Sequence, residues 1–116
     1  MTLRRLHPMT LQEVTLSDEM RDRVISIWDS AFPKIGFIQT GSRLDAVTVG
    51  GMLKVEVFLQ FGPDQDSLRF IFRHMGNAQF KDLVLGNPDW AALERWVTEL
   101  RERTDNTIKD MQTWLV

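Results

Sequence analysis

The stretch that decides the fold runs from residue 52 to residue 61 and reads MLKVEVFLQF. Its apolar residues occupy every second position from Leu53 to Phe61. Because successive side chains of a strand point to opposite faces, this alternation predicts a β-strand with one buried face. Residues 68–75 repeat the two-residue period, and the turn-forming residues 62–67 separate the two segments. The pair predicts an antiparallel hairpin with a loop of about six residues.

The segments on either side of this hairpin predict further strands. Residues 44–49 form a short predicted strand that ends at the turn signal Gly50-Gly51. The rest of residues 34–51 is predicted as loop. Residues 79–85 fit either another strand or a short helical turn. The sheet is therefore expected to have three or four strands.

A first helix is predicted to begin near Ser17, whose side chain suits an N-cap. Asp18 and Glu19 follow and place negative charge at the positive end of the helix dipole. Apolar residues then recur at helical spacing, at Met20, Val24, Ile27, Trp28 and Ala31. Pro33 disfavours the helical conformation at Phe32 and is predicted to end the helix.

A second, longer helix is predicted from the apolar periodicity of the C-terminal part. Asn87 is expected to be its N-cap, with Pro88 at the first helical position and Asp89 in the first turn. Apolar residues then recur at steps of three and four positions as far as Leu115, so the helix would span about 40 Å. The weak helix formers at 105–107 allow a kink there.

Together these elements predict an α+β fold in a single domain of residues 1–116. We expect an antiparallel β-meander of three to four strands, flanked by an N-terminal helix and a long C-terminal helix packed on one face. Each amphipathic helix has one stripe to bury, and the continuously apolar face of the sheet can receive both. Residues 1–16 are left open between a short strand and an extended arm.

Composition and charge exclude several classes of protein. The chain has 116 residues, enough to build its own core, and its net charge is −2. Such a balance gives no overall field that would attract nucleic acid. The absence of cysteine excludes disulfides and thiolate chemistry and fits a reducing compartment. No apolar run approaches the length of a membrane helix, and the N-terminus lacks the apolar region of a signal peptide. We therefore expect a cytoplasmic protein without membrane contact.

The sequence contains no motif that indicates catalysis or a cofactor. The nucleophile motifs G-x-S-x-G and S-x-x-K and the glycine-rich phosphate loops are absent. Neither His7 nor His74 belongs to a catalytic signature, and His74 is interpreted as a residue at the edge of the core. Asp64 and Asp66 have calcium-loop spacing, but the following residues do not supply the other ligands. No catalytic residue, metal or cofactor is expected.

The outward face of the predicted sheet is the most informative surface. If the helices cover the face of Val55 and Phe70, the opposite face mixes large apolar side chains with basic ones. We interpret this face as a partner-binding surface, formed by Lys54, Phe58, Arg69, Ile71 and Arg73, with Met52 beside them. An ordinary solvated face and a face covered by the N-terminal arm are the alternatives.

Trp114 is a second candidate for partner binding. It is the third residue from the C-terminus and lies one position off the apolar stripe of the long helix. It either caps the core or forms an exposed aromatic anchor for a partner.

These features favour a small cytoplasmic protein-binding module, not an enzyme, that acts by occlusion or adaptor action. Inhibitors, immunity proteins, chaperones and assembly factors of bacteria or phages share this size and this lack of chemistry. The expected partner is another protein, and a homodimer is left open. One alternative is a small-ligand-binding or enzymatic domain, with a pocket between sheet and C-terminal helix that uses polar groups from Arg43, Glu56, His74 or Asp82. A second alternative is nucleic-acid binding through the basic sheet face, which the negative net charge disfavours.

Overall fold

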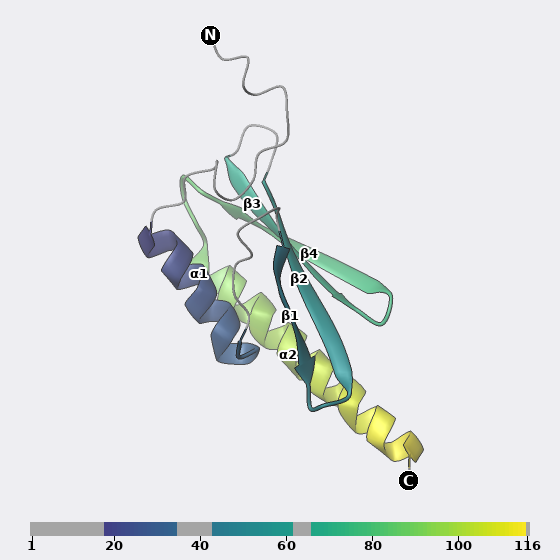
Figure 1. Ribbon diagram of the computed structural model, residues 1–116. Coiled ribbons are helices and arrows are strands. Elements are labelled where there is room, and N and C mark those ends of the chain that lie inside the picture. Colours follow the sequence, from purple (N-terminus) through teal and green to yellow (C-terminus); the bar gives the residue numbers. More distant parts are fainter. Residues whose placement is uncertain (1–17, 35–42, 62–65, 116) are drawn as a thin grey trace.

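The structure, a computed structural model, describes residues 18–34, 43–61 and 66–115. Its elements are α1 (Asp18–Ala31), β1 (Arg43–Val49), β2 (Leu53–Phe61), β3 (Ser67–His74), β4 (Asn77–Val84) and α2 (Trp90–Leu115). The four strands form one antiparallel sheet in the order β1-β2-β3-β4, and both helices lie on the same side of it (Figure 1). The predicted α+β meander is confirmed.

Two predictions about the strands can be compared with these bounds. The short strand predicted before the Gly50-Gly51 turn is present as β1. The ambiguous segment 79–85 is strand as far as Val84, because all eight residues of β4 pair with β3. The predictions made for residues 1–16 and for the loop after residue 34 fall outside the described residues, apart from Lys34. No helix in the described parts of the chain is long and apolar enough to cross a membrane.

The alternation in the two central strands separates the sheet into a buried and an open face. Their buried side chains are Leu53, Val55, Val57, Leu59, Leu68, Phe70 and Phe72. Trp28 of α1 is fully buried over this face, with its ring centroid 5.8 Å from that of Phe70 and 6.3 Å from that of Phe72. Apolar side chains of α2 complete the same core, among them Leu93, Val97, Leu100 and Ile108. The helices therefore cover the face that the sequence pattern assigned to them.

The end of α1 is fixed by polar contacts around Pro33. The backbone N–H of Phe32 donates to Trp28 O at 2.7 Å, and that of Lys34 donates to Asp29 Oδ1 at 2.7 Å. Lys34 has a positive φ of 80°, which turns the chain away from the helix. The helix ends before the proline, as predicted.

The N-terminus of α2 differs from the prediction by two residues. The helix begins at Trp90, and the side chain of Asp89 accepts a hydrogen bond from the N–H of Ala92 at 3.0 Å. That is the contact of an N-cap residue with the third helical residue. The predicted cap at Asn87 is therefore wrong; Asp89 is the cap, and Pro88 lies outside the helix.

The remainder of α2 is one continuous helix of 26 residues, without a break at 105–107. Thr104 interrupts the apolar stripe but is fully buried, and its hydroxyl donates to Leu100 O at 2.7 Å. The hydroxyl is thus satisfied within its own helix, so burying it leaves no unpaired donor.

Candidate interface on the open face of the sheet

Three large apolar side chains form a line across the open face, which is the side of the sheet turned away from the helices. Phe58 of β2 is the register partner of Ile71 of β3, and Ile71 is in turn the partner of Phe80 of β4. Directly opposed residues of antiparallel strands have their side chains on the same face and in contact range. We call these three residues the apolar row. Phe80 retains 59% of its accessible surface.

An arginine side chain lies against each end of the apolar row. The guanidinium carbon of Arg69 lies 4.2 Å from the ring centroid of Phe80, and that of Arg73 lies 5.0 Å from the ring centroid of Phe58. Both distances are within the range of a cation–π contact. The arginines therefore extend the aromatic surface with planar cationic groups.

Each arginine is also held by a carboxylate of a neighbouring strand. Arg69 Nε and Nη2 donate to the two carboxylate oxygens of Asp82 at 2.7 and 3.0 Å, and Arg73 Nη2 lies 3.5 Å from Glu56 Oε1. The first pair is bidentate, the geometry that fixes a guanidinium group best. The stacking positions of the arginines are thus set within the chain itself.

The bidentate pair also shifts the ionisation of both partners. The hydrogen bonds from Arg69 lower the pKa of Asp82 below its usual value, and the hydrogen bonds to Asp82 raise the pKa of Arg69. Both groups are consequently charged over the whole physiological pH range, so this part of the face does not change charge near neutrality.

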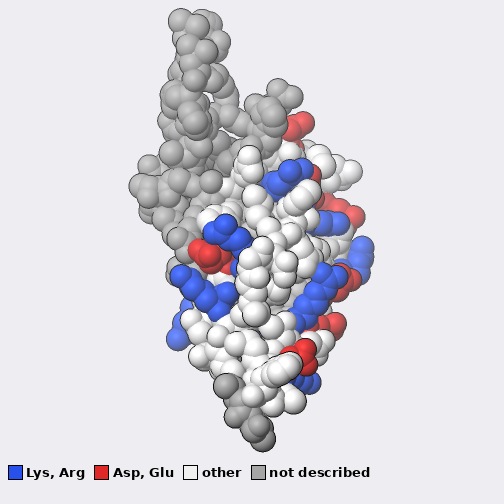
Figure 2. All heavy atoms as spheres, turned by 90° about the vertical axis from the view of Figure 1, so that its right-hand side faces the viewer, with Lys and Arg blue, Asp and Glu red and all other residues white. Residues whose placement is uncertain are grey.

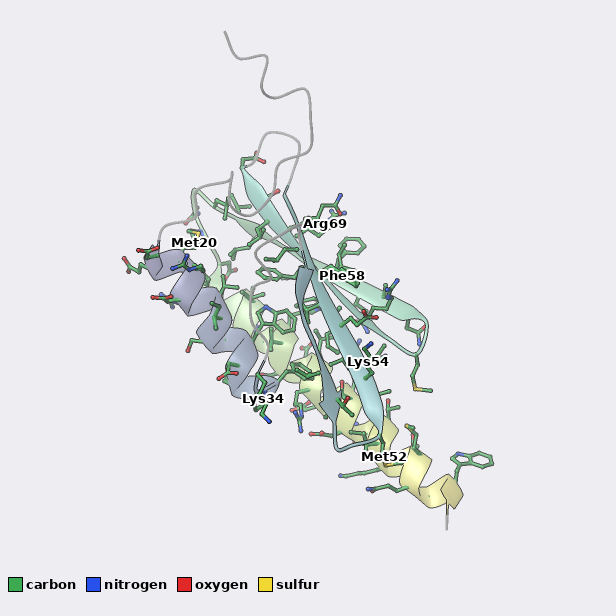
Figure 3. All side chains as sticks on the ribbon, viewed as in Figure 1. Met20, Lys34, Met52, Lys54, Phe58 and Arg69 are labelled. Carbon is green, nitrogen blue, oxygen red and sulfur yellow. The ribbon has the colours of Figure 1, made fainter. Side chains whose placement is uncertain are left out.

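Five of the residues predicted from the sequence lie together on this face. They are Lys54, Phe58, Arg69, Ile71 and Arg73. In Figure 3 the labelled side chains of Lys54, Phe58 and Arg69 point away from the helices. Figure 2 shows the same side of the molecule as an uncharged band bordered by Lys and Arg side chains, with Asp and Glu next to many of them. The part these residues play in binding stays a prediction.

Two other predicted positions are separate from this group. Met52 precedes β2 in the turn and packs against the core, so the expectation that it would extend the open face is wrong. Trp114, near the end of α2, keeps 86% of its accessible surface. It therefore does not cap the core, and its role as an anchor for a partner stays a prediction.

The contribution of β4 to the open face was not predicted from the sequence. Phe80, Asp82 and Val84 belong to it, and they alternate with Gln79, Lys81 and Leu83 on the helix side. The two-residue period is present in the sequence, but its larger apolar residues occur on both faces. Such a pattern cannot say which face is buried.

Of the polar groups suggested for a catalytic pocket, the three whose side chains are described do not meet between sheet and helix. Glu56 and Asp82 lie on the open face, paired with arginines. His74 lies on the other face, 5.5 Å from the ring of Phe72, and its buried Nδ1 has no hydrogen-bond partner among the described residues. Burial lowers the pKa of His74. The side chain of Arg43 is outside what the structure describes.

The described parts of the two helices border an open groove. A groove of about 320 Å³ lies between α1 and α2, lined by Ser26, Ile27, Ser30, Glu94, Val97 and Thr98. The hydroxyls of Ser30 and Thr98 donate to carbonyls of their own helices at 2.7 and 2.9 Å. Glu94 is the single titratable group of this lining, so the groove brings no acid–base pair together.

Metal ligands are not grouped in the described parts of the chain, where no three side chains of His, Asp or Glu could hold an ion. The open face therefore remains the surface with the most distinctive chemistry. No protein-family model, curated protein or solved structure matches the chain.

Proposed function

We propose that the protein is a small protein-binding module, without chemistry of its own, that binds another protein through the open face of its sheet. The observation that carries this proposal is the apolar row Phe58–Ile71–Phe80 with an arginine stacked at each end. Aromatic and arginine side chains are the residues that most often dominate the free energy of protein–protein binding.

The ion pairs on the face support the same proposal. An arginine that is already held by a carboxylate loses little conformational entropy when a partner covers it. Arg69 and Arg73 are both in this state, through Asp82 and Glu56. The arginine side chains are thus already ordered before a partner covers the face. Such a face suits action by occlusion or as an adaptor, in the manner of an inhibitor, immunity protein, chaperone or assembly factor.

Nucleic acid is a weaker candidate for the partner. Phosphate groups would have to compete with Asp82 and Glu56 for the two arginines, and carboxylates on the same face repel them. Lys54 is the remaining basic side chain among those predicted for this face, and the net charge of the chain is −2.

Affinity capture with matched variants tests the proposal. The wild-type protein, Phe58→Ala, Arg69→Ala and the control Arg95→Ala, which changes an exposed arginine on α2, are used as bait in nuclease-treated lysate of the source cell or its natural host. We expect wild type and Arg95→Ala to retain the same protein at low and high salt. Loss of one central contact weakens binding by about 2 kcal/mol, or roughly 30-fold, so the two face variants should lose it.

Circular dichroism spectra and thermal midpoints of all four proteins show whether a lost partner reflects a lost fold. Equal capture by the face variants and by Arg95→Ala would place the binding surface elsewhere and overturn the proposal. Material that disappears with nuclease or salt would indicate nucleic acid instead.

A further inference from the structure

The outer edge of β4 has the properties of a strand that pairs with another chain. All eight residues of β4 pair with β3 without a register shift, whereas the pairing of β1 is irregular between Arg43 and Ala46. β4 is the last strand in the order of the sheet, and no described strand lies on its other side (Figure 1). Regular edges of this length are normally blunted by bulges, prolines or cover, because they recruit further strands.

The hairpin geometry fixes which backbone groups face this edge. Met75 and Gly76 both have positive φ, 48° and 79°, and join β3 to β4 in a two-residue turn closed by the pair His74–Asn77. In such a turn the closing pair is hydrogen-bonded, and every second residue of β4 after Asn77 faces β3 with its N–H and C=O. Leu85 keeps this alternation, since its N–H donates to Asp66 O at 2.9 Å.

It follows that the even-numbered residues of β4 turn their backbone N–H and C=O groups toward the outer edge, where no described strand pairs with them. These residues are Ala78, Phe80, Asp82 and Val84. Their side chains lie on the open face, so this edge and the apolar row share Phe80.

Exposed apolar side chains are concentrated at the same edge. Phe80 and Val84 of β4 keep 59% and 54% of their accessible surface, and Met75 in the adjoining turn keeps 63%. Lys81 is the one basic residue of the strand, and it lies on the helix side. At this edge, backbone groups that face no described strand thus lie beside exposed hydrophobic surface.

We propose that β4 pairs antiparallel with β4 of a second copy of this chain, with Phe80 opposite Phe80 on the twofold axis. The pairing joins two four-stranded sheets into one of eight strands. It also joins the apolar rows of the two copies into a single row across six strands. It uses the edge of the sheet, so each open face stays available to a partner, and the proposal does not depend on the function proposed above.

Charge favours this register over the two registers that place the axis at Lys81 or at Asp82. With Phe80 on the axis, Lys81 is opposite Gln79 and Asp82 is opposite Ala78 of the second copy. Moving the axis to Lys81 sets two lysines against each other, and moving it to Asp82 sets two aspartates against each other. Like charges directly opposed on neighbouring strands are destabilising.

Amide hydrogen exchange read residue by residue by NMR, alongside sedimentation equilibrium, tests the proposal on the full chain. We expect a monomer–dimer equilibrium in which the amides of Phe80 and Asp82 become protected as the dimer fraction rises. The amides of Gln79, Lys81 and Leu83 bond to β3, so they should be protected at every protein concentration.

Two substitutions at the edge and one control on the face complete the test. Ala78→Pro removes an N–H that points to the edge and keeps the apolar row, and Phe80→Lys places two cations on the axis. Each should shift the dissociation constant of the dimer upward by at least tenfold, with circular dichroism spectra like that of wild type. Phe58→Ala, which changes the row away from the edge, should keep the dimer and so exclude face-to-face association.

Three results would overturn the proposal. The first is a protein that stays monomeric at the highest concentration reached. The second is protection of the Phe80 and Asp82 amides in the monomer, which would mean that another segment of the chain covers the edge. The third is a dimer that both edge variants leave intact.

Discussion

At the scale of single residues, Trp28 contributes most to the packing of this small core. Its side chain is fully buried, and its ring is in contact with those of Phe32, Phe70, Phe72 and Trp96. Trp28 itself belongs to α1, and its partners lie just after α1, in β3 and in α2, so one side chain joins both helices to the sheet. Aromatic pairs at these distances add to the free energy gained from burial.

Trp28→Ala is expected to lower the free energy of unfolding by about 3–5 kcal/mol, because the cavity left in the core cannot collapse fully. Trp114→Ala is the matched control, since 86% of the accessible surface of Trp114 is exposed. We expect it to change the free energy of unfolding by less than about 0.5 kcal/mol. Chemical denaturation of both variants measures the difference. A large loss with Trp114→Ala would mean that this tryptophan packs against the protein.

His74 is expected to make stability depend on pH. Burial lowers its pKa below the usual 6.5, so the unfolded chain binds the proton more readily than the folded one. The contribution of neutral His74 to the free energy of unfolding should therefore be fully present above pH 6.5. It should be lost as the pH falls from 6.5 through the lowered pKa. Denaturation at a series of pH values should show this slope in wild type and a smaller one in His74→Gln. Identical slopes would contradict the assignment to His74.

At the scale of elements, the start of α2 depends on one cap. Asp89→Ala should lower the free energy of unfolding by about 1 kcal/mol, because it removes the acceptor of the Ala92 N–H. Asp89→Asn keeps a hydrogen-bond acceptor and should lower the free energy of unfolding much less. Asn87→Ala, two residues earlier, is the control and should have little effect. Thermal denaturation ranks the three variants, and a larger loss with Asn87→Ala than with Asp89→Ala would restore Asn87 as the cap.

The elements differ in how far the sequence could predict them. The strand around Val55 was predictable because a sheet with one covered face requires apolar residues at every second position. The N-cap of α2 was not predictable in this way, because Asn87 and Asp89 are both good N-cap residues. The choice between them depends on whether Pro88 lies inside or outside the helix. Met52 was misassigned because the alternation was extended one residue into the turn.

β4 is the element that sequence patterns describe least well, and for this reason part of the candidate site was not predicted. As an edge strand it places Gln79 and Lys81 on the helix side, where the margin of the core is partly solvated, and Phe80 on the open side. The side chains on β2 and β3 were predicted because their opposite face is continuously apolar. Phe80 and Asp82, the two residues that contact Arg69, could be assigned to the open face only once the register of β4 was known.

At the scale of the whole molecule, two contacts join α2 to segments that are distant in the sequence. Arg101 Nη1 of α2 donates to Ala31 O at the end of α1 at 2.7 Å, across 70 residues of sequence. Ile108 of α2 lies under the β1–β2 turn, where a Cβ added to Gly50 would be 3.1 Å from Ile108 Cδ1. α2 is thus tied both to the end of α1 and to the β1–β2 end of the sheet.

The two turn glycines are therefore expected to respond differently to substitution. Both have positive φ, 62° for Gly50 and 73° for Gly51, so an alanine at either position is strained by about 1 kcal/mol. Gly51 has open space around it, whereas Gly50→Ala must also displace Ile108. Gly50→Ala should thus lower the free energy of unfolding more than Gly51→Ala. In an Ile108→Val background, which removes Cδ1, the difference should shrink; an unchanged difference would exclude this contact as the cause.

The meander order of the strands has a consequence for the speed of folding. Each strand pairs with its neighbour in sequence, so the sheet closes through short loops and has a low contact order for a β structure. The docking of α1 against α2, with its 70-residue separation, is the costly closure that remains. We expect the contact between α1 and α2 to form after the rate-limiting barrier of folding. In stopped-flow measurements, Arg101→Ala should therefore accelerate unfolding and leave the refolding rate nearly unchanged. A slowed refolding arm would instead place the joining of the helices within the folding nucleus.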